Sequence, residues 1–119
     1  MGLIATPTLL AATGKPPQQI AECVGRLNMG GTGLSIARMP SPGGWQEAAQ
    51  TPEFDEYTLM LRGSVRIESG NGVADVKAGR AFFASKGEWV RYTTPEEDGA
   101  EYIVVCVPAF SQAAVHRDT

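Results

Sequence analysis

The sequence predicts an all-β domain, and three observations carry that prediction. The 119 residues include 14 glycines and 8 prolines, many for a helical bundle and typical of short strands joined by turns. Seven short runs of β-compatible residues follow one another between residues 33 and 107. Between two of them, residues 69–72 read SGNG, a strong hairpin-turn signal. Such regular spacing is typical of a β-sandwich or a β-barrel.

The expected elements can be taken in order along the chain. Residues 16–27 have no clear period, so they allow either a helical turn or an extended lead-in. Residues 41–56 and 94–99 are polar and rich in turn formers, which predicts loops. The expected strands occupy residues 33–40, 57–62, 64–68, 73–78, 78–84, 88–93 and 101–107.

Length and composition indicate one domain, residues 1–119, with an N-terminal arm (1–32), a barrel core (33–108) and a C-terminal tail (109–119). A formal net charge of −3 without a run of lysine or arginine argues against a nucleic-acid partner. The apolar start of the chain lacks a positively charged region and is too short to cross a bilayer. It is expected to pack on the barrel or on a partner subunit, and we predict no membrane association.

Cys23 and Cys106 lie far apart and form no CxxC pair, which favours reduced thiols in a cytoplasmic protein. A single disulfide between them remains an open alternative.

Two glycine-anchored motifs connect this pattern to a known family. Glu56 is followed after six residues by Gly63, and Gly44 precedes them. In this respect the chain resembles the cupins, whose first motif is a glycine, His-x-His, three or four residues, a glutamate, six residues and a glycine. Gln50 and Pro52 occupy the two histidine positions.

The second cupin motif is a glycine, five residues, Pro-x-Gly, two residues, a histidine and a later asparagine. Gly79, Ser85 and Gly87 keep that spacing, whereas Val90 and Thr94 replace the histidine and the asparagine. The stretches FDEYTLMLRG, SKGEWVRYTTP and YIVVCVPAF are most similar to the ethanolamine-utilisation Q type. The resemblance implies a jelly-roll β-barrel, also termed a double-stranded β-helix, with a pocket inside.

The residues at the motif positions argue against a metal. A transition-metal site of this family needs two or three imidazoles and a carboxylate, and Gln50, Pro52 and Val90 cannot supply the imidazoles. The sole histidine, His116, lies outside both motifs. We therefore predict no metal and no cofactor.

The resemblance implies that Glu56 points into the barrel, and strand alternation then identifies the other residues that face the pocket. Thr58 and Met60 then share the face of Glu56, and Glu88, Val90 and Tyr92 face inward from a later strand. We predict Glu56 as general base and Tyr92 as proton donor or orienting group. The predicted substrate-binding residues are Gln50, Met60, Glu88, Arg91, Cys106 and His116.

Structural interpretations of these residues stay open. Glu56 could instead bind Arg62, Arg91 or backbone amides, and Tyr92 could be a core aromatic. Cys106 could be a small buried hydrophobe, and His116 could lie on a solvated tail.

The predicted function is the binding of a small organic molecule, with metal-independent lyase or isomerase chemistry at Glu56. The alternatives are a non-catalytic metabolite-binding or sensor protein, and a scaffold with a filled barrel. We also expect a homodimer, since the apolar N-terminal arm and exposed sheet edges need covering.

Overall fold

The computed structural model describes residues 2–12, 18–47 and 49–117. The prediction of an all-β fold is confirmed: within these residues only one short helix occurs. The strands are β1 (Thr8–Ala12), β2 (Gln18–Val24), β3 (Ser35–Ser41), β4 (Asp55–Arg62), β5 (Ser64–Ser69), β6 (Gly72–Lys77), β7 (Ala81–Ala84), β8 (Val90–Thr93) and β9 (Ala100–Val107), and the helix is α1 (Gln112–Val115).

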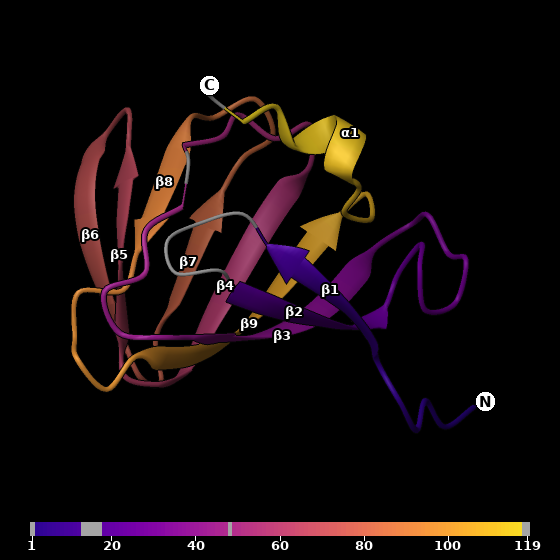
Figure 1. Cartoon of the computed structure of the whole chain (residues 1–119). Helices are drawn as coiled ribbons and strands as arrows, with labels where there is room; N and C mark the ends of the chain where they lie inside the picture. The colour runs from indigo at the N-terminus through magenta and orange to yellow at the C-terminus, as the bar shows by residue number, and fades with distance from the viewer. Residues whose placement is uncertain (1, 13–17, 48, 118–119) are drawn as a thin grey trace.

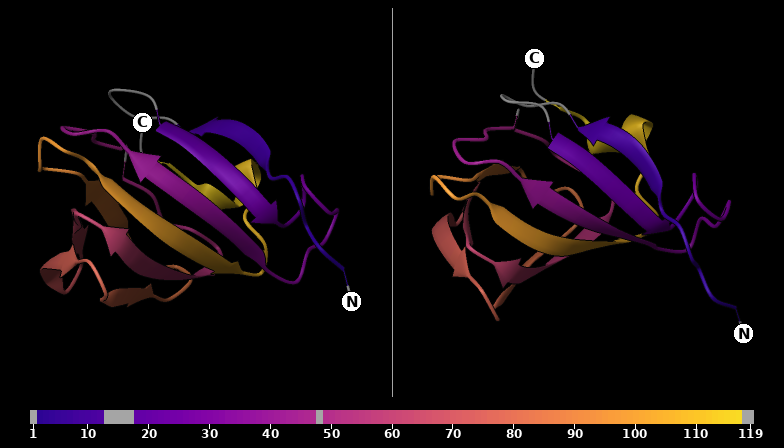
Figure 2. Two further views of the ribbon diagram at one scale, coloured as in Figure 1. Left: turned by 90° about the horizontal axis from the view of Figure 1, so that it is seen from below. Right: turned by 60° about the horizontal axis from the view of Figure 1, so that its bottom comes forward.

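The strands form two antiparallel sheets that face each other across the interior (Figure 1). The larger sheet has the order β1-β2-β3-β9-β4-β7, and the smaller has the order β6-β5-β8. Figure 2 shows β1, β2, β3 and β9 side by side, with the smaller sheet at the opposite side of the molecule. Because β9 lies between β3 and β4, the last strand joins segments from both halves of the chain, as in a jelly roll.

The N-terminal arm belongs to the sheet. β2 pairs with β3, and β1 pairs with β2 and forms the edge. The ambiguous residues 16–27 therefore contain a strand rather than a helical turn, although residues 13–17 lie outside the described residues. Packing of the arm on the barrel is confirmed, whereas contact with a partner subunit stays a prediction.

Burial along β4 alternates with period two. Glu56, Thr58 and Met60 are buried, as the sequence predicted, and Tyr57 and Leu59 are exposed. In a strand, successive side chains point to opposite faces of the sheet. The inward row of β4 thus contributes to the interior of the barrel and the outward row to its surface.

Gly63 is required by the turn between β4 and β5. It has φ +73°, and a Cβ there would lie 2.4 Å from the carbonyl oxygen of Gly99. Any side chain would clash with that backbone and would be strained at this φ. The glycine of the Glu56–Gly63 spacing is therefore required by the backbone geometry of the turn.

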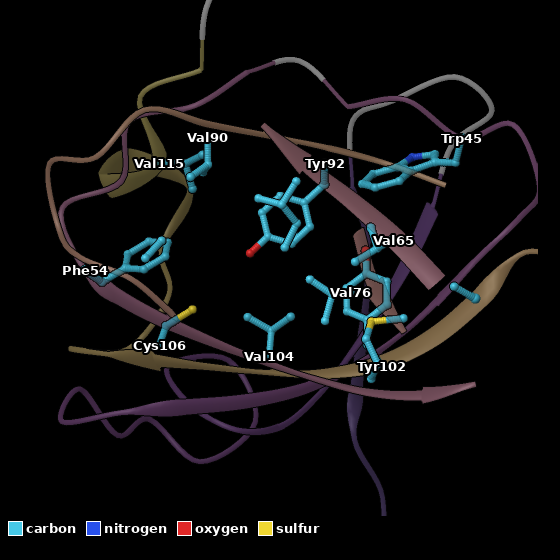
Figure 3. Close-up of a cluster of buried hydrophobic side chains, with 14 residues drawn as sticks. Trp45, Phe54, Val65, Val76, Val90, Tyr92, Tyr102, Val104, Cys106 and Val115 are labelled. Atoms are coloured by element: carbon cyan, nitrogen blue, oxygen red, sulfur yellow. The ribbon is translucent and has the colours of Figure 1, made fainter. Parts of the chain in front are cut away.

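The hydrophobic core fills the interior between the two sheets (Figure 3). Its most completely buried apolar side chains come from both sheets, from the loop before β4 and from α1: Trp45, Phe54, Met60, Val65, Ile67, Val90, Tyr102 and Val115.

The C-terminal segment closes one end of this interior. The Ser111 side chain caps α1 by accepting a hydrogen bond from the amide of Ala114 at 3.2 Å. The amides of Thr51 and Glu53 donate to the carbonyls of His116 and Ala114 at 3.1 and 2.8 Å. These bonds tie the C-terminal segment to the loop that precedes β4.

Within the described part of the chain, no helix is long and apolar enough to cross a membrane.

Candidate functional site

A cavity lies between the sheets beside the C-terminal segment. The centres of water molecules can occupy about 50 Å³ of it, which is room for several waters because one needs about 10–15 Å³. Its walls come from β2, β3, β4, β8, β9, the loop before β4 and the C-terminal segment. The lining residues are Ile20, Glu22, Ser35, Ala37, Met39, Glu47, Gln50, Glu56, Tyr92, Tyr102, Val104, Cys106, Phe110 and Arg117.

A chain of hydrogen bonds crosses the cavity from β4 to β8. The Tyr92 hydroxyl donates a short hydrogen bond to Glu56 Oε1 and lies 2.9 Å from the Thr58 hydroxyl. A hydroxyl has one proton, so when Tyr92 donates to Glu56, it accepts from Thr58. Figure 3 shows the Tyr92 hydroxyl directed into the interior, facing the strand that carries Val104 and Cys106. Among the described residues, the hydrogen-bond partner of the Glu56 carboxyl is thus a tyrosine rather than an arginine.

A second carboxylate is held by the backbone of the same tyrosine. Glu47 Oε1 accepts a hydrogen bond from the Tyr92 amide at 3.2 Å, and the Glu47 amide donates to the Tyr92 carbonyl at 3.2 Å. Tyr92 therefore binds Glu47 through its main chain and Glu56 through its hydroxyl. Two carboxylates are brought to one cavity by a single residue of β8.

The pKa values of both carboxylates are raised. Burial raises the pKa of Glu56, and the hydrogen bond from Tyr92 opposes this shift. For Glu47, removal from solvent is the largest cause of a pKa well above its usual range, and the nearby charge of Glu56 raises it further, whereas the Tyr92 amide and the charge of Arg117 oppose the shift. Burial also raises the pKa of the Tyr92 hydroxyl, as do the charges of Glu56 and Glu47, which keeps this hydroxyl protonated.

Four of the residues predicted to form the site meet at the cavity: Gln50, Glu56, Tyr92 and Cys106. Backbone bonds of 2.9 Å in both directions between Gln50 and Val90 hold Gln50 beside β8. Burial raises the pKa of the Cys106 thiol far above its usual range, and the charge of Glu56 adds to the effect. Cys106 is therefore a poor nucleophile and serves as a small buried wall residue.

The other four predicted residues lie outside the lining of the cavity. Met60 faces inward but packs in the apolar core. Glu88 precedes β8, in a turn where its carboxylate accepts from the Ser85 amide at 3.1 Å, so strand alternation does not apply to it. Arg91 points outward and pairs with Glu68 at 2.8 Å. His116 is exposed and pairs with Glu53 at 2.7 Å.

Sequence reasoning missed several lining residues, of which Glu47 and Arg117 matter most. Glu47 stands in a polar loop, and Arg117 stands near the end of the chain, beyond both motifs. An isolated bridge between Gln50 and Arg117 brings the C-terminal segment to the cavity. No local signal predicts this contact, because it depends on how the tail folds back.

The residues present do not fit the transition metal that the cupin fold implies. At the histidine positions, Val90 is fully buried in the apolar core, and Pro52 has no ligating side chain. The carboxylate position, Glu56, is bonded to Tyr92. Among the described residues, no group of three or more histidine, cysteine, aspartate or glutamate side chains could hold a metal ion. The donor set is therefore unsuited to such an ion.

Comparison with solved structures identifies the fold. Oxalate decarboxylase of Bacillus subtilis at pH 4.6 is similar to this chain with a TM-score of 0.79 and 20% identity, over 96% of this chain and 30% of that one. A tryptophan-to-tyrosine variant of the same enzyme gives a TM-score of 0.78 and 19% identity, over 96% and 31%. The chain has the cupin fold. It spans about a third of these structures, and identities this low show the fold alone.

Sequence comparison adds one relative. The chain is 34% identical over 102 residues to a protein named endoribonuclease YbeY from Myxococcus xanthus (strain DK1622). The match covers 86% of this chain and 35% of that protein, so the chain spans about a third of its length. No family model matches the chain. Assignment to the ethanolamine-utilisation Q type stays a prediction.

Proposed function

We propose that this cupin binds a small organic molecule in the cavity and that Glu56 exchanges a proton with it, without a metal. One observation carries the proposal: a buried carboxylate lines a cavity and is hydrogen-bonded to a tyrosine instead of being paired with a cation of the described chain. The sequence left Arg62 and Arg91 as possible partners of Glu56. Arg62 instead donates to the Asp98 carbonyl at 3.1 Å, and Arg91 binds Glu68.

The electrostatics support a role in proton transfer. A general base works best when its pKa is near the operating pH, and burial raises the pKa of Glu56 in that direction. Glu56 would take a proton from the ligand and return it to a second atom, which is isomerase or lyase chemistry. Tyr92, bonded to both Glu56 and Thr58, suits the role of orienting group.

Two alternatives differ in what they require of the cavity. A non-catalytic binding or sensor protein would use the same cavity without proton exchange. A scaffold would have a filled barrel, and the presence of a cavity argues against this alternative. The endoribonuclease activity in the name of the relative is not carried over, because the match covers about a third of that protein. The net charge of −3 also gives little attraction for an RNA backbone.

The test is a ligand screen followed by a proton-exchange assay. Small acids, amines, amino acids and polyols are screened by thermal shift, since a ligand that binds only the folded state raises Tm. Each molecule that binds is then incubated with the protein in D₂O and followed by proton NMR for exchange at carbon. Catalysis predicts exchange that Glu56→Gln abolishes while binding persists.

Other results would decide between the remaining possibilities. Binding without exchange, unchanged by Glu56→Gln, would support the non-catalytic alternative. A ligand whose binding survives Ala37→Phe, which should fill the cavity, would show that the cavity is not its site.

A homodimer is also proposed, formed by a second copy of this chain on the outer face of the larger sheet. Tyr57, Leu59 and Leu61 of β4 and Phe83 of β7 are exposed there at 44–48% of their surface. Tyr57 pairs with Phe83 in register, and their rings lie 4.9 Å apart. Exposed apolar patches of this kind mark interaction sites. Because the outward side chains of β4 carry few charges, this face can pack against the identical face of a second copy.

Light scattering at micromolar concentration tests the dimer. The wild-type protein should have the mass of two chains, and Leu59→Glu should reduce the mass to one. A wild-type monomer would contradict the proposal.

The cytoplasmic location predicted from the thiols stays a prediction, supported by Cys23 and Cys106 being unpaired.

A further inference from the structure

The charged groups around the cavity have unused hydrogen-bonding capacity. Within the described ranges, Glu47 and Glu56 each accept one hydrogen bond at Oε1, both from Tyr92. Among the described residues, neither forms an ion pair within 4.0 Å. Glu56 is buried and Glu47 is half-buried, and carboxylates removed from water are normally paired with a cation or fully hydrogen-bonded. The charge of Arg117 is near enough to lower the pKa of Glu47, yet no cation of the described chain forms an ion pair with either carboxylate.

Arg117 has a hydrogen-bond donor without an acceptor. Its Nη1 donates to Gln112 Oε1 at 2.9 Å, but its Nε is buried and has no hydrogen-bond partner in the described ranges. An unsatisfied donor of a charged group is costly, and guanidinium groups bind carboxylates with two parallel hydrogen bonds. Arg117 lines the same cavity as the two glutamates. This part of the cavity can therefore receive an acceptor.

We propose that the cavity binds a small zwitterion, with its amino group against Glu47 and Glu56 and its carboxylate against Arg117. The proposal rests on the proposed function, because it assigns a ligand class to the same cavity. The limited volume favours a molecule of a few non-hydrogen atoms. A short amino acid has both charges within that size.

Ligands with one charge satisfy only half of the site. An amine would pair with the glutamates and leave Arg117 Nε without an acceptor. A carboxylate would satisfy Arg117 and add a further negative charge near Glu47 and Glu56, where burial already disfavours charge. A neutral ligand would pair with neither group. A zwitterion supplies both missing partners and adds no net charge to the interior.

Isothermal titration calorimetry with three molecules of similar size and shape tests the proposal. The probes are β-alanine, propionate, which lacks the amine, and n-propylamine, which lacks the carboxylate. β-Alanine should bind at least about tenfold more tightly than either, since a hydrogen bond to a charged group contributes about 1.5–3 kcal/mol. Propionate or n-propylamine binding as tightly as β-alanine would overturn the proposal.

Variants assign the two ends of the ligand. Arg117→Met should weaken β-alanine about tenfold and leave n-propylamine unchanged, whereas Glu47→Gln should weaken both by a similar factor. Arg66→Met, which removes an exposed arginine paired with Asp75, is the matched control and should change neither. Equal weakening by Arg117→Met and Arg66→Met would refute the assignment of Arg117.

The outcome also separates this inference from the proposed function. If no zwitterion of the probe set or the screen binds while another screened molecule shows proton exchange that Glu56→Gln abolishes, the zwitterion is wrong and the proposed function stands. If neither the probes nor the screened molecules bind, both are wrong.

Discussion

The two ends of the barrel interior differ in chemistry although the same strands build them. Along β4, the inward side chains change from Glu56 at the cavity, through Thr58, to Met60 in the apolar core. Along β9, Cys106 and Val104 line the cavity, and Ala100 lies in the core. The apolar end is closely filled by residues such as Ile67, whereas the other end keeps a cavity.

The difference shows that facing inward does not define a site residue. Thr58 is fully buried and serves the cavity only through Tyr92. Alternation identifies which side chains enter the barrel. The position along the strand, together with what the opposite wall supplies, decides whether they pack or bind.

The largest expected effect compares packing at the two ends. Ile67→Ala in the apolar core should lower the free energy of unfolding by about 4 kcal/mol, and Ile20→Ala at the cavity wall by about 2 kcal/mol. A side chain beside an existing cavity makes fewer contacts to lose. Urea denaturation measures both, and equal losses would show that the two ends are packed alike.

The next effect concerns the hydrogen-bond chain. Tyr92→Phe should lower the free energy of unfolding by about 2 kcal/mol at pH 7, since Glu56 and Thr58 lose a buried partner. Tyr57→Phe, on the exposed outer face, is the matched control and should change it by less than about 0.5 kcal/mol. Similar effects in the two variants would mean that the bonds of Tyr92 do not stabilise the fold.

The raised pKa of Glu56 predicts a change with pH. Because the folded-state pKa exceeds the unfolded value, the folded state binds more protons between the two values. The contribution of Glu56 to stability is therefore fully present below the unfolded pKa and falls as pH rises through the folded pKa. Glu56→Gln should remove this fall, by about 1.4 kcal/mol for each unit of difference.

Urea denaturation of the wild type and of Glu56→Gln at several pH values from about 4 to 8 tests whether the contribution of Glu56 falls as pH rises. The stability difference, wild type minus Glu56→Gln, should decrease as pH rises. Glu97→Gln, in an exposed loop, controls for the loss of one charge. Parallel curves for wild type and Glu56→Gln would contradict a raised pKa.

The smallest effect is expected outside the barrel. Arg91 and Glu68 form an ion pair whose side chains are 44% and 30% exposed. Solvent screens such pairs, so Arg91→Met should cost less than about 0.5 kcal/mol. A double-mutant cycle with Glu68→Gln measures the coupling, and a coupling above about 1 kcal/mol would show that the outer surface rivals the interior hydrogen bonds.

Much of the fold could be predicted from local patterns. Glycine and proline located the turns. The resemblance to the cupins placed Glu56 inside the barrel, and period-two alternation then placed Thr58 and Met60 on the same face. The strand at Gln18–Val24 was not predicted, because its own residues fit two periods and its pairing with β3 decides between them. Glu88 was placed in a strand, because the predicted strand began at residue 88, whereas β8 begins two residues later at Val90.

By itself, the sequence determined an all-β domain of short strands, the two alternating rows of β4, and the absence of histidines at the positions where the cupin motifs have them. These properties are local, since they depend on residue type, turn chemistry and spacing. Only the tertiary structure decided that Glu47, Glu56 and Arg117 line one cavity and that Arg91 and His116 do not. Such contacts join residues far apart in the chain, and the packing of the two sheets and the C-terminal segment creates them.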